Sequence, residues 1–241
     1  MDPYRPPQSG MELAQKGTAT ADDPFHGMAW EIGTVINVAV ERFKENAGVL
    51  LGLGAAAFGV NFGMSFVSQI VLALLEPGSN AYFAVFSVIQ LISIVLQTAV
   101  TLGVIKVAIS VARNEEASVA DMLKVLPVLV PGMLASLLVG MGTMVGFMLL
   151  IVPGFLWLAA TLFSLYGIVD KELGVIDGIK HSLAVTEGEL GKLLLWTFVA
   201  GLLMVALTVF TCGFGMLVAN PLMFVANALI YDNMARRKGL A

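Results

Sequence analysis

Hydrophobic positions in this chain form long unbroken runs instead of short alternating groups. The longest run, from Val125 to Val169, contains no Asp, Glu, Lys, Arg or His. One crossing of a hydrocarbon core about 30 Å thick takes about 20 helical residues, so this run is long enough for two crossings. Near its middle, Pro153 and Gly154 disfavour a continuous helix and favour a turn. The pattern predicts two membrane helices folded into a hairpin at this structural turn.

Three further runs carry no charge: residues 46–75, 77–105 and 193–231. An outer-membrane barrel would show segments of about 10 residues with alternating polarity, which this sequence lacks. We therefore predict an all-α, polytopic membrane protein with six transmembrane helices in three hairpins. The predicted spans are about 47–74, 80–111, 128–151, 155–170, 191–210 and 215–234.

An amphipathic segment precedes the first, third and fifth spans. In each of residues 32–44, 119–126 and 175–183, apolar residues recur at helical spacing opposite charged or polar ones. Ser118 and Asp121 have the spacing of a capping box. Such helices suit the headgroup boundary. The chain then consists of three repeats of an interfacial helix plus a hairpin; the alternative is that each hairpin only needs a cytoplasmic connector.

Composition supports the membrane assignment. The 241 residues are 58% hydrophobic and 12% charged, whereas a soluble domain carries about 25% charged residues. Residues 1–27 are polar and rich in Pro and Gly, so we expect a flexible cytoplasmic tail before a membrane domain over 28–238. Cys212 is the only cysteine, which excludes an internal disulfide and a thiolate metal cage.

Positive charge is confined to alternate connections. All 13 Lys and Arg residues precede the first span, follow the sixth, or lie near the connections between spans two and three and between four and five. The turns near residues 76–81, 152–154 and 211–215 contain none. Because short loops rich in Lys and Arg stay in the cytoplasm, both termini are predicted to be cytoplasmic.

Several short motifs in the second half carry a family resemblance. They are Ile151–Phe155, Ile168–Asp170, Ile176–Ser182, Thr186–Gly188, Asn220–Leu222, and Tyr231-Asp232 before Arg236-Arg237. Together they resemble the six-helix membrane domain that accompanies some bacterial glycerophosphoryl diester phosphodiesterases, and related stand-alone membrane proteins. The resemblance implies the fold and a bacterial inner-membrane location. It does not imply phosphodiesterase activity, which resides in a separate soluble domain.

The sequence offers little for catalysis. His26 and His181 are the two histidines and are far apart, and no Gly-rich phosphate loop ends in Lys-Ser or Lys-Thr. Asp170 and Glu172, at the end of the fourth span, are typical of a membrane boundary. We expect no charge buried within the spans, which disfavours ion-coupled transport. The prediction is a non-enzymatic protein without metal or cofactor.

Neutral polar residues recur at helical spacing in the first two spans. Such stripes form hydrogen bonds between helices or line a water-filled path, and we favour the former. The residues are Asn61, Ser65, Gln69, Gln90, Ser93, Gln97 and Thr101.

Small residues and one proline mark packing points. Gly59-x-x-x-Gly63 and Gly142-x-x-x-Gly146 allow close helix approach, within the chain in preference to dimerisation. Pro221, inside the sixth span, frees a backbone carbonyl and predicts a structural kink.

These features predict a scaffold, or a module that binds lipid or a protein partner. Its expected partners are the bilayer and proteins on the cytoplasmic face, with no nucleic acid and an undetermined oligomeric state. The alternative is a passive channel or transporter for small solutes, lined by the polar stripes. Candidate lipid-headgroup residues, which equally serve as topology signals, are Arg42, Lys44, Arg236, Arg237 and Lys238.

Overall fold

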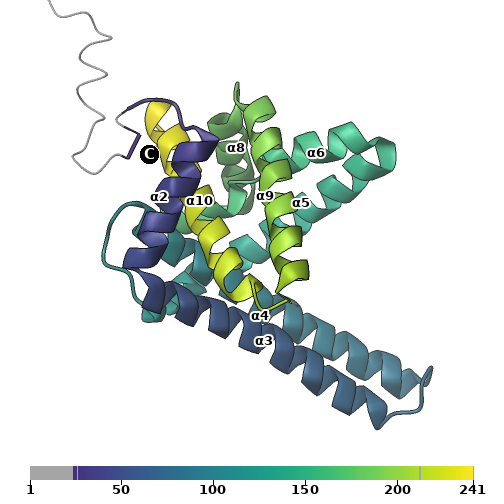
Figure 1. The fold of residues 1–241 in the computed structure, drawn as a ribbon. Helices are drawn as coiled ribbons and strands as arrows, with labels where there is room; N and C mark the ends of the chain where they lie inside the picture. Colours follow the sequence, from purple (N-terminus) through teal and green to yellow (C-terminus); the bar gives the residue numbers. More distant parts are fainter. Residues whose placement is uncertain (1–23, 26, 212, 241) are drawn as a thin grey trace, which may run out of the picture.

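The computed structural model describes residues 24–25, 27–211 and 213–240, and all regular structure in these ranges is helical (Figure 1). Of the expected tail, only residues 24, 25 and 27 are therefore described. His26 and Cys212 also lie outside the described residues. The elements are α2 (Ile32–Glu45), α3 (Ala47–Ala73), α4 (Asn80–Ala112), the 3₁₀ helix η1 (Val119–Val128), α5 (Leu129–Leu149), α6 (Ile151–Ala160), α7 (Ser164–Lys171), α8 (Val175–Thr186), α9 (Leu190–Phe210) and α10 (Met216–Arg237).

Five helical segments among the described residues are long and apolar enough to cross a membrane. They are Ala47–Ala73, Asn80–Ala112, Val119–Leu149, Ile151–Lys171 and Leu190–Phe210. A multi-pass membrane protein is therefore the class that the structure supports. The sixth expected span is also a helix, α10, but it is not among these five.

Helix α10 lies at the centre of the fold. It packs against α2, α3, α4, α8 and α9, and its second half is almost fully buried. Leu229, Ile230 and Tyr231 are each at most 2% exposed. A helix that contacts protein on most of its surface can carry polar and charged residues that lipid would not tolerate. Its modest hydrophobicity is therefore consistent with its place in the core.

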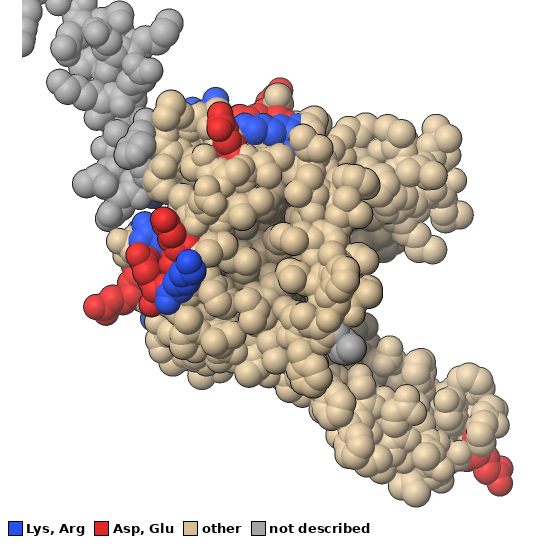
Figure 2. Space-filling model, viewed as in Figure 1, with Lys and Arg blue, Asp and Glu red and all other residues tan. Residues whose placement is uncertain are grey.

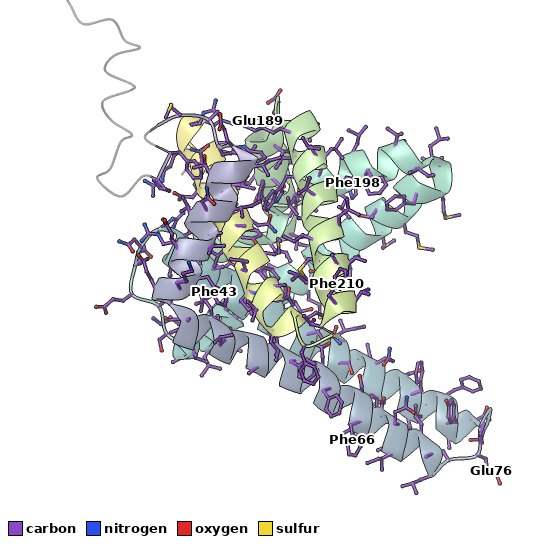
Figure 3. All side chains as sticks on the ribbon, in the orientation of Figure 1. Phe43, Phe66, Glu76, Glu189, Phe198 and Phe210 are labelled. Carbon is purple, nitrogen blue, oxygen red and sulfur yellow. The ribbon has the colours of Figure 1, made fainter. Side chains whose placement is uncertain are left out.

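Two hairpins project from this body in different directions (Figure 1). One is formed by α3 and α4, and the other by α5 and α6. Their outer parts expose large apolar side chains, for example Phe62 (63%) and Met148 (77%). Glu76 lies in the turn at the far tip of the α3–α4 hairpin (Figure 3). In the face shown in Figure 2, the other charged residues gather well away from this tip.

The turn between α5 and α6 falls earlier than the sequence predicts. The helix breaks at Leu150, whose backbone is extended, and Pro153 and Gly154 lie in the first turn of α6. Proline is tolerated there because the first N–H groups of a helix have no intrahelical partner. Gly154 instead allows close packing, since an added Cβ would lie 2.6 Å from the ring of Phe147.

Helical segments stand at all three places where amphipathic helices are predicted: α2, η1 and α8. The Ser118–Asp121 capping box is confirmed, with the Ser118 N–H donating to Asp121 Oδ2 at 2.8 Å. The apolar face of α2 meets protein, because Val35 and Ala39 are buried and α2 packs on α10. Placement of the three segments at the headgroup boundary stays a prediction.

Candidate functional site

A charged cluster joins the ends of α4, α7 and α10. Arg113, which caps the C-terminus of α4, donates from Nη1 and Nη2 to the two carboxylate oxygens of Asp170, at 2.6 and 2.9 Å. Its Nε donates to Asp232 Oδ1 at 2.8 Å. The other oxygen of Asp232 lies 2.6 Å from Nε of Arg236. One guanidinium thus holds carboxylates from two other helices, in the forked geometry that gives the strongest ion pairs.

Two further side chains extend the cluster toward α8. The Tyr231 hydroxyl donates to Asp170 Oδ2 at 3.2 Å, and His181 Nε2 lies 3.1 Å from the same hydroxyl. A tyrosine hydroxyl has one hydrogen, which Asp170 accepts, so His181 must be the donor of the second bond. The geometry assigns the Nε2–H tautomer to His181. A continuous chain of polar contacts therefore runs from α8 to the end of α10.

The charged side chains of this cluster are largely buried. The Asp170 side chain is 8% exposed and that of Arg113 is 21% exposed. Burial alone would lower the pKa of Arg113, but the hydrogen bonds and negative charges of Asp170 and Asp232 outweigh it and raise that pKa. Burial and the positive charge of Lys171 lower the pKa of His181, against the opposing effect of Asp170. The expectation of no buried charge within the spans is therefore wrong for Asp170, which lies near the end of the fourth span.

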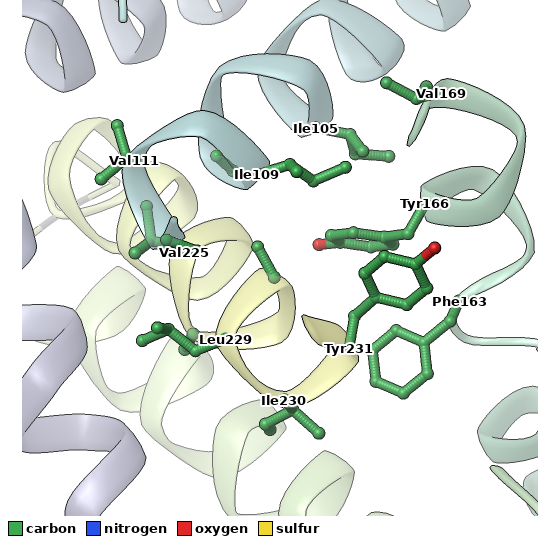
Figure 4. Close-up of a cluster of buried hydrophobic side chains, with 14 of the residues drawn as sticks. Ile105, Ile109, Val111, Phe163, Tyr166, Val169, Val225, Leu229, Ile230 and Tyr231 are labelled. Carbon is green, nitrogen blue, oxygen red and sulfur yellow. The ribbon is translucent and has the colours of Figure 1, made fainter. Parts of the chain in front are cut away.

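Three aromatic rings form a wall beside the cluster (Figure 4). Phe163, Tyr166 and Tyr231 lie with each pair of ring centroids 5.7 Å apart. Figure 4 shows the rings of Tyr166 and Tyr231 near Ile105 and Ile109 of α4. This apolar packing fixes the ring of Tyr231 and thus the direction of its hydroxyl toward Asp170.

Side chains of α8 form hydrogen bonds with backbone groups at the break between α6 and α7. Ser182 accepts a hydrogen bond from the Phe163 N–H at 3.1 Å and donates to the Ala160 carbonyl at 2.7 Å. Thr186 donates to the same carbonyl at 3.2 Å. Backbone groups left open by the break are thus bonded without water, which a buried position requires. The break in turn brings Phe163 into the aromatic wall.

Seven residues from the family-resemblance motifs meet in this region: Asp170, His181, Ser182, Thr186, Tyr231, Asp232 and Arg236. Arg113, which joins two of them, was not singled out by the sequence analysis. The sequence offers one signal for Arg113: it lies at the end of a span, on the same predicted side of the membrane as Asp170 and Asp232. That signal served only to assign topology, because the sequence does not show which span ends are neighbours.

The polar stripes of the first two spans separate into two groups. A pocket of about 130 Å³ between α3, α4 and α10 is lined by Asn61, Gln97 and Thr101, together with Asn220. The other four predicted residues, Ser65, Gln69, Gln90 and Ser93, do not line it. Asn61 and Ser93 donate to carbonyls of their own helices, at 2.9 and 2.8 Å. The structure therefore gathers three of the seven residues around one cavity.

The same region contains the proline of α10. Pro221 has no N–H for the carbonyl four residues before it, that of Leu217. A Cβ added to Gly54 of α3 would lie 2.3 Å from this Leu217 oxygen. The freed carbonyl therefore points at α3, where only glycine allows the helices to come this close.

Most of the candidate headgroup-binding cations are engaged within the chain. Arg42 pairs with Glu45 and Asn114, Arg236 with Asp232, and Arg237 with Glu189 at 2.6 Å. Lys238 donates to the carbonyls of Ala184 and Glu187. The Lys44 side chain makes no hydrogen bond or ion pair to any described residue, and the residue is exposed. At the other four residues, lipid phosphates would compete with the partners within the chain.

No group of three His, Cys, Asp or Glu side chains within the described part of the chain is arranged to hold a metal ion. Comparison of the chain with protein-family models, with curated proteins and with solved structures finds no match. The resemblance to the six-helix bacterial membrane domain accordingly stays an expectation. The function proposed below therefore depends on the geometry of the structure alone.

Proposed function

We propose that this chain is a non-catalytic module of the bacterial cytoplasmic membrane, which holds a rigid surface on the cytoplasmic side for a protein or lipid partner. The observation that carries the proposal is the Arg113 cluster. It fixes the ends of α4, α7 and α10 at one point, with each of its charges paired.

Contacts among the predicted cytoplasmic segments support the proposed orientation. Arg42 reaches Asn114, Arg113 reaches Asp170, and Arg237 reaches Glu189. Each contact joins two connections that the distribution of Lys and Arg assigns to the same side. Glu76 lies at the opposite extreme, on the hairpin tip (Figure 3).

Helix α8 provides the surface that such a partner would meet. Its inner side is held by Ser182 and His181, while Ile176 and Leu183 are 55% and 40% exposed. Lys180 and Glu187 are exposed between and beyond them. A face that mixes apolar and charged side chains on a fixed helix suits a protein interface better than the hydrocarbon core.

Site-specific photo-crosslinking in cells tests this surface. A photoreactive residue at Lys180 should form a protein adduct, whereas one at Phe210, which is 88% exposed on the membrane helix α9, should label only lipid. The matched variant Ile176→Glu should remove the Lys180 adduct. Lipid labelling alone at both positions contradicts a protein partner on α8.

The pocket between α3, α4 and α10 favours a second candidate function, passage of small solutes. Its polar lining is neutral, from Asn61, Gln97, Thr101 and Asn220, and a path without charge gives an ion little compensation for its lost hydration. The expected cargo is a neutral solute that forms hydrogen bonds.

Purified protein in liposomes separates the two functions. The scaffold predicts no release of ions or neutral solutes beyond that of empty liposomes. The passage function predicts release that Gln97→Leu removes and Gln90→Leu preserves. Gln90 is the matched control because it lies on the same helix and does not line the pocket.

A further inference from the structure

The side of α3 that faces away from α4 carries a pattern suited to another helix. Gly59, Phe62, Phe66 and Gln69 follow one another at spacings of three, four and three residues. Residues with this spacing lie on one face of a helix, as at the seam of a coiled coil. Gly63 and Ile70 flank the same line. We call these six residues the outer face of α3.

The outer face is open in the single chain. Phe62 and Phe66 are 63% and 58% exposed, and Figure 3 shows Phe66 on the side of the hairpin away from α4. A Cβ added at Gly59 or Gly63 would meet no atom within 4 Å. The glycines of the other predicted motif differ, because a Cβ at Gly142 would lie 2.5 Å from Trp157. That second motif is used within the chain, and the first is not.

Gln69 is a polar residue on this otherwise apolar face, and its amide group needs hydrogen-bond partners. Its side chain is exposed and makes no hydrogen bond to any described residue, whereas Asn61 and Ser68 of the same helix donate to carbonyls of α3, each at 2.9 Å. Gln69 lies within Ala47–Ala73, one of the segments long and apolar enough to cross a membrane. An amide that faces lipid without a partner there is costly.

We propose that a second copy of this chain docks on the outer face, α3 against α3, across a two-fold axis along the membrane normal. Both copies insert with the same orientation, so such an axis brings identical positions together in parallel helices. An amide both donates and accepts, so Gln69 of each copy satisfies the other. Gly59 and Gly63 form the crossing point, where small residues let two backbones approach. The phenylalanines then pack beside the crossing.

Oligomeric state in lipid vesicles tests the proposal, with single-molecule photobleaching of labelled protein as the readout. Wild-type protein should give dimers at low protein-to-lipid ratios. Gly59→Ile with Gly63→Ile should give monomers, and Gln69→Leu should weaken the dimer roughly 3- to 30-fold. Gly201→Ile is the control, because Gly201 of α9 also has no atom within 4 Å of an added Cβ and should leave the dimer intact. Circular dichroism reports whether each variant keeps its helices.

Cysteine crosslinking locates the contact without disturbing the glycines. In a Cys212→Ser background, Phe66→Cys should give a disulfide-linked dimer. Met144→Cys, on the similarly exposed α5, should not. Monomers throughout for the wild type, equal loss with Gly201→Ile, or crosslinks at Met144 without crosslinks at Phe66 would each overturn the proposal.

Discussion

Arg113 and Asp170, 57 residues apart in the chain, join the ends of α4 and α7 by two parallel hydrogen bonds of 2.6 and 2.9 Å. Both side chains are mostly buried, so each partner is essential to the other. Removal of one partner leaves a charge that neither water nor lipid stabilises fully.

We expect Arg113→Met to lower the free energy of unfolding by about 2–3 kcal/mol, because Asp170 and Asp232 lose their shared partner. Lys124→Met is the matched control. Its partner is Asp121, but the Lys124 side chain is 70% exposed, so the expected loss is about 0–1 kcal/mol. Unfolding in detergent measures both losses, and equal values would contradict a structural role for the cluster.

Stability should fall as the pH decreases from about 7.5 to about 5.5, because the unfolded chain takes up a proton on His181 that the folded chain resists. The folded state lowers the pKa of His181 through burial and the charge of Lys171, although Asp170 opposes this shift. Stability is therefore full above the ordinary histidine pKa and decreases below it.

The variant His181→Gln keeps a donor for the Tyr231 hydroxyl and removes the titration. Its melting temperature should depend less on pH across this interval than that of the wild type. The same slope in both proteins would show that another group controls the response.

Gly54→Ala should destabilise the contact between α3 and α10 by about 1–3 kcal/mol, since its Cβ would lie 2.3 Å from the Leu217 oxygen. Gly201→Ala, with open space around it, should instead be neutral or stabilising by up to about 1 kcal/mol. Thermal unfolding of the two variants measures the difference. Equal changes in the two variants would contradict the close contact, because the higher helix propensity of Ala by itself should stabilise both.

Ser182→Ala should lower the free energy of unfolding by about 1–3 kcal/mol, because the buried Phe163 N–H loses its acceptor. Ser87→Ala is the control. Ser87 is exposed and donates only to the Phe83 carbonyl of its own helix, and its removal should change stability by less than about 0.5 kcal/mol. Hydrogen exchange at Phe163 reports the site directly, with faster exchange expected in Ser182→Ala.

The sequence by itself determined the membrane class and the bounds of the first two long helices. The first two expected spans, 47–74 and 80–111, correspond to α3 and α4 within one residue at each end. The reason is physical: the length of an apolar run is a local property, and lipid selects runs by length and hydrophobicity. The capping box at Ser118 is equally local and was equally predictable.

Tertiary structure alone decided which polar residues meet. Gln90 and Gln97 are equivalent in sequence, yet α10 reaches the level of Gln97 only, so one lines a pocket and the other does not. From the sequence alone, Arg113 has the pattern of a residue that sets membrane topology. Only the packing of α7 and α10 places the carboxylates of Asp170 and Asp232 beside it. Such contacts depend on how separate helices pack against one another, and helix packing involves residues far apart in the chain, which no local pattern specifies.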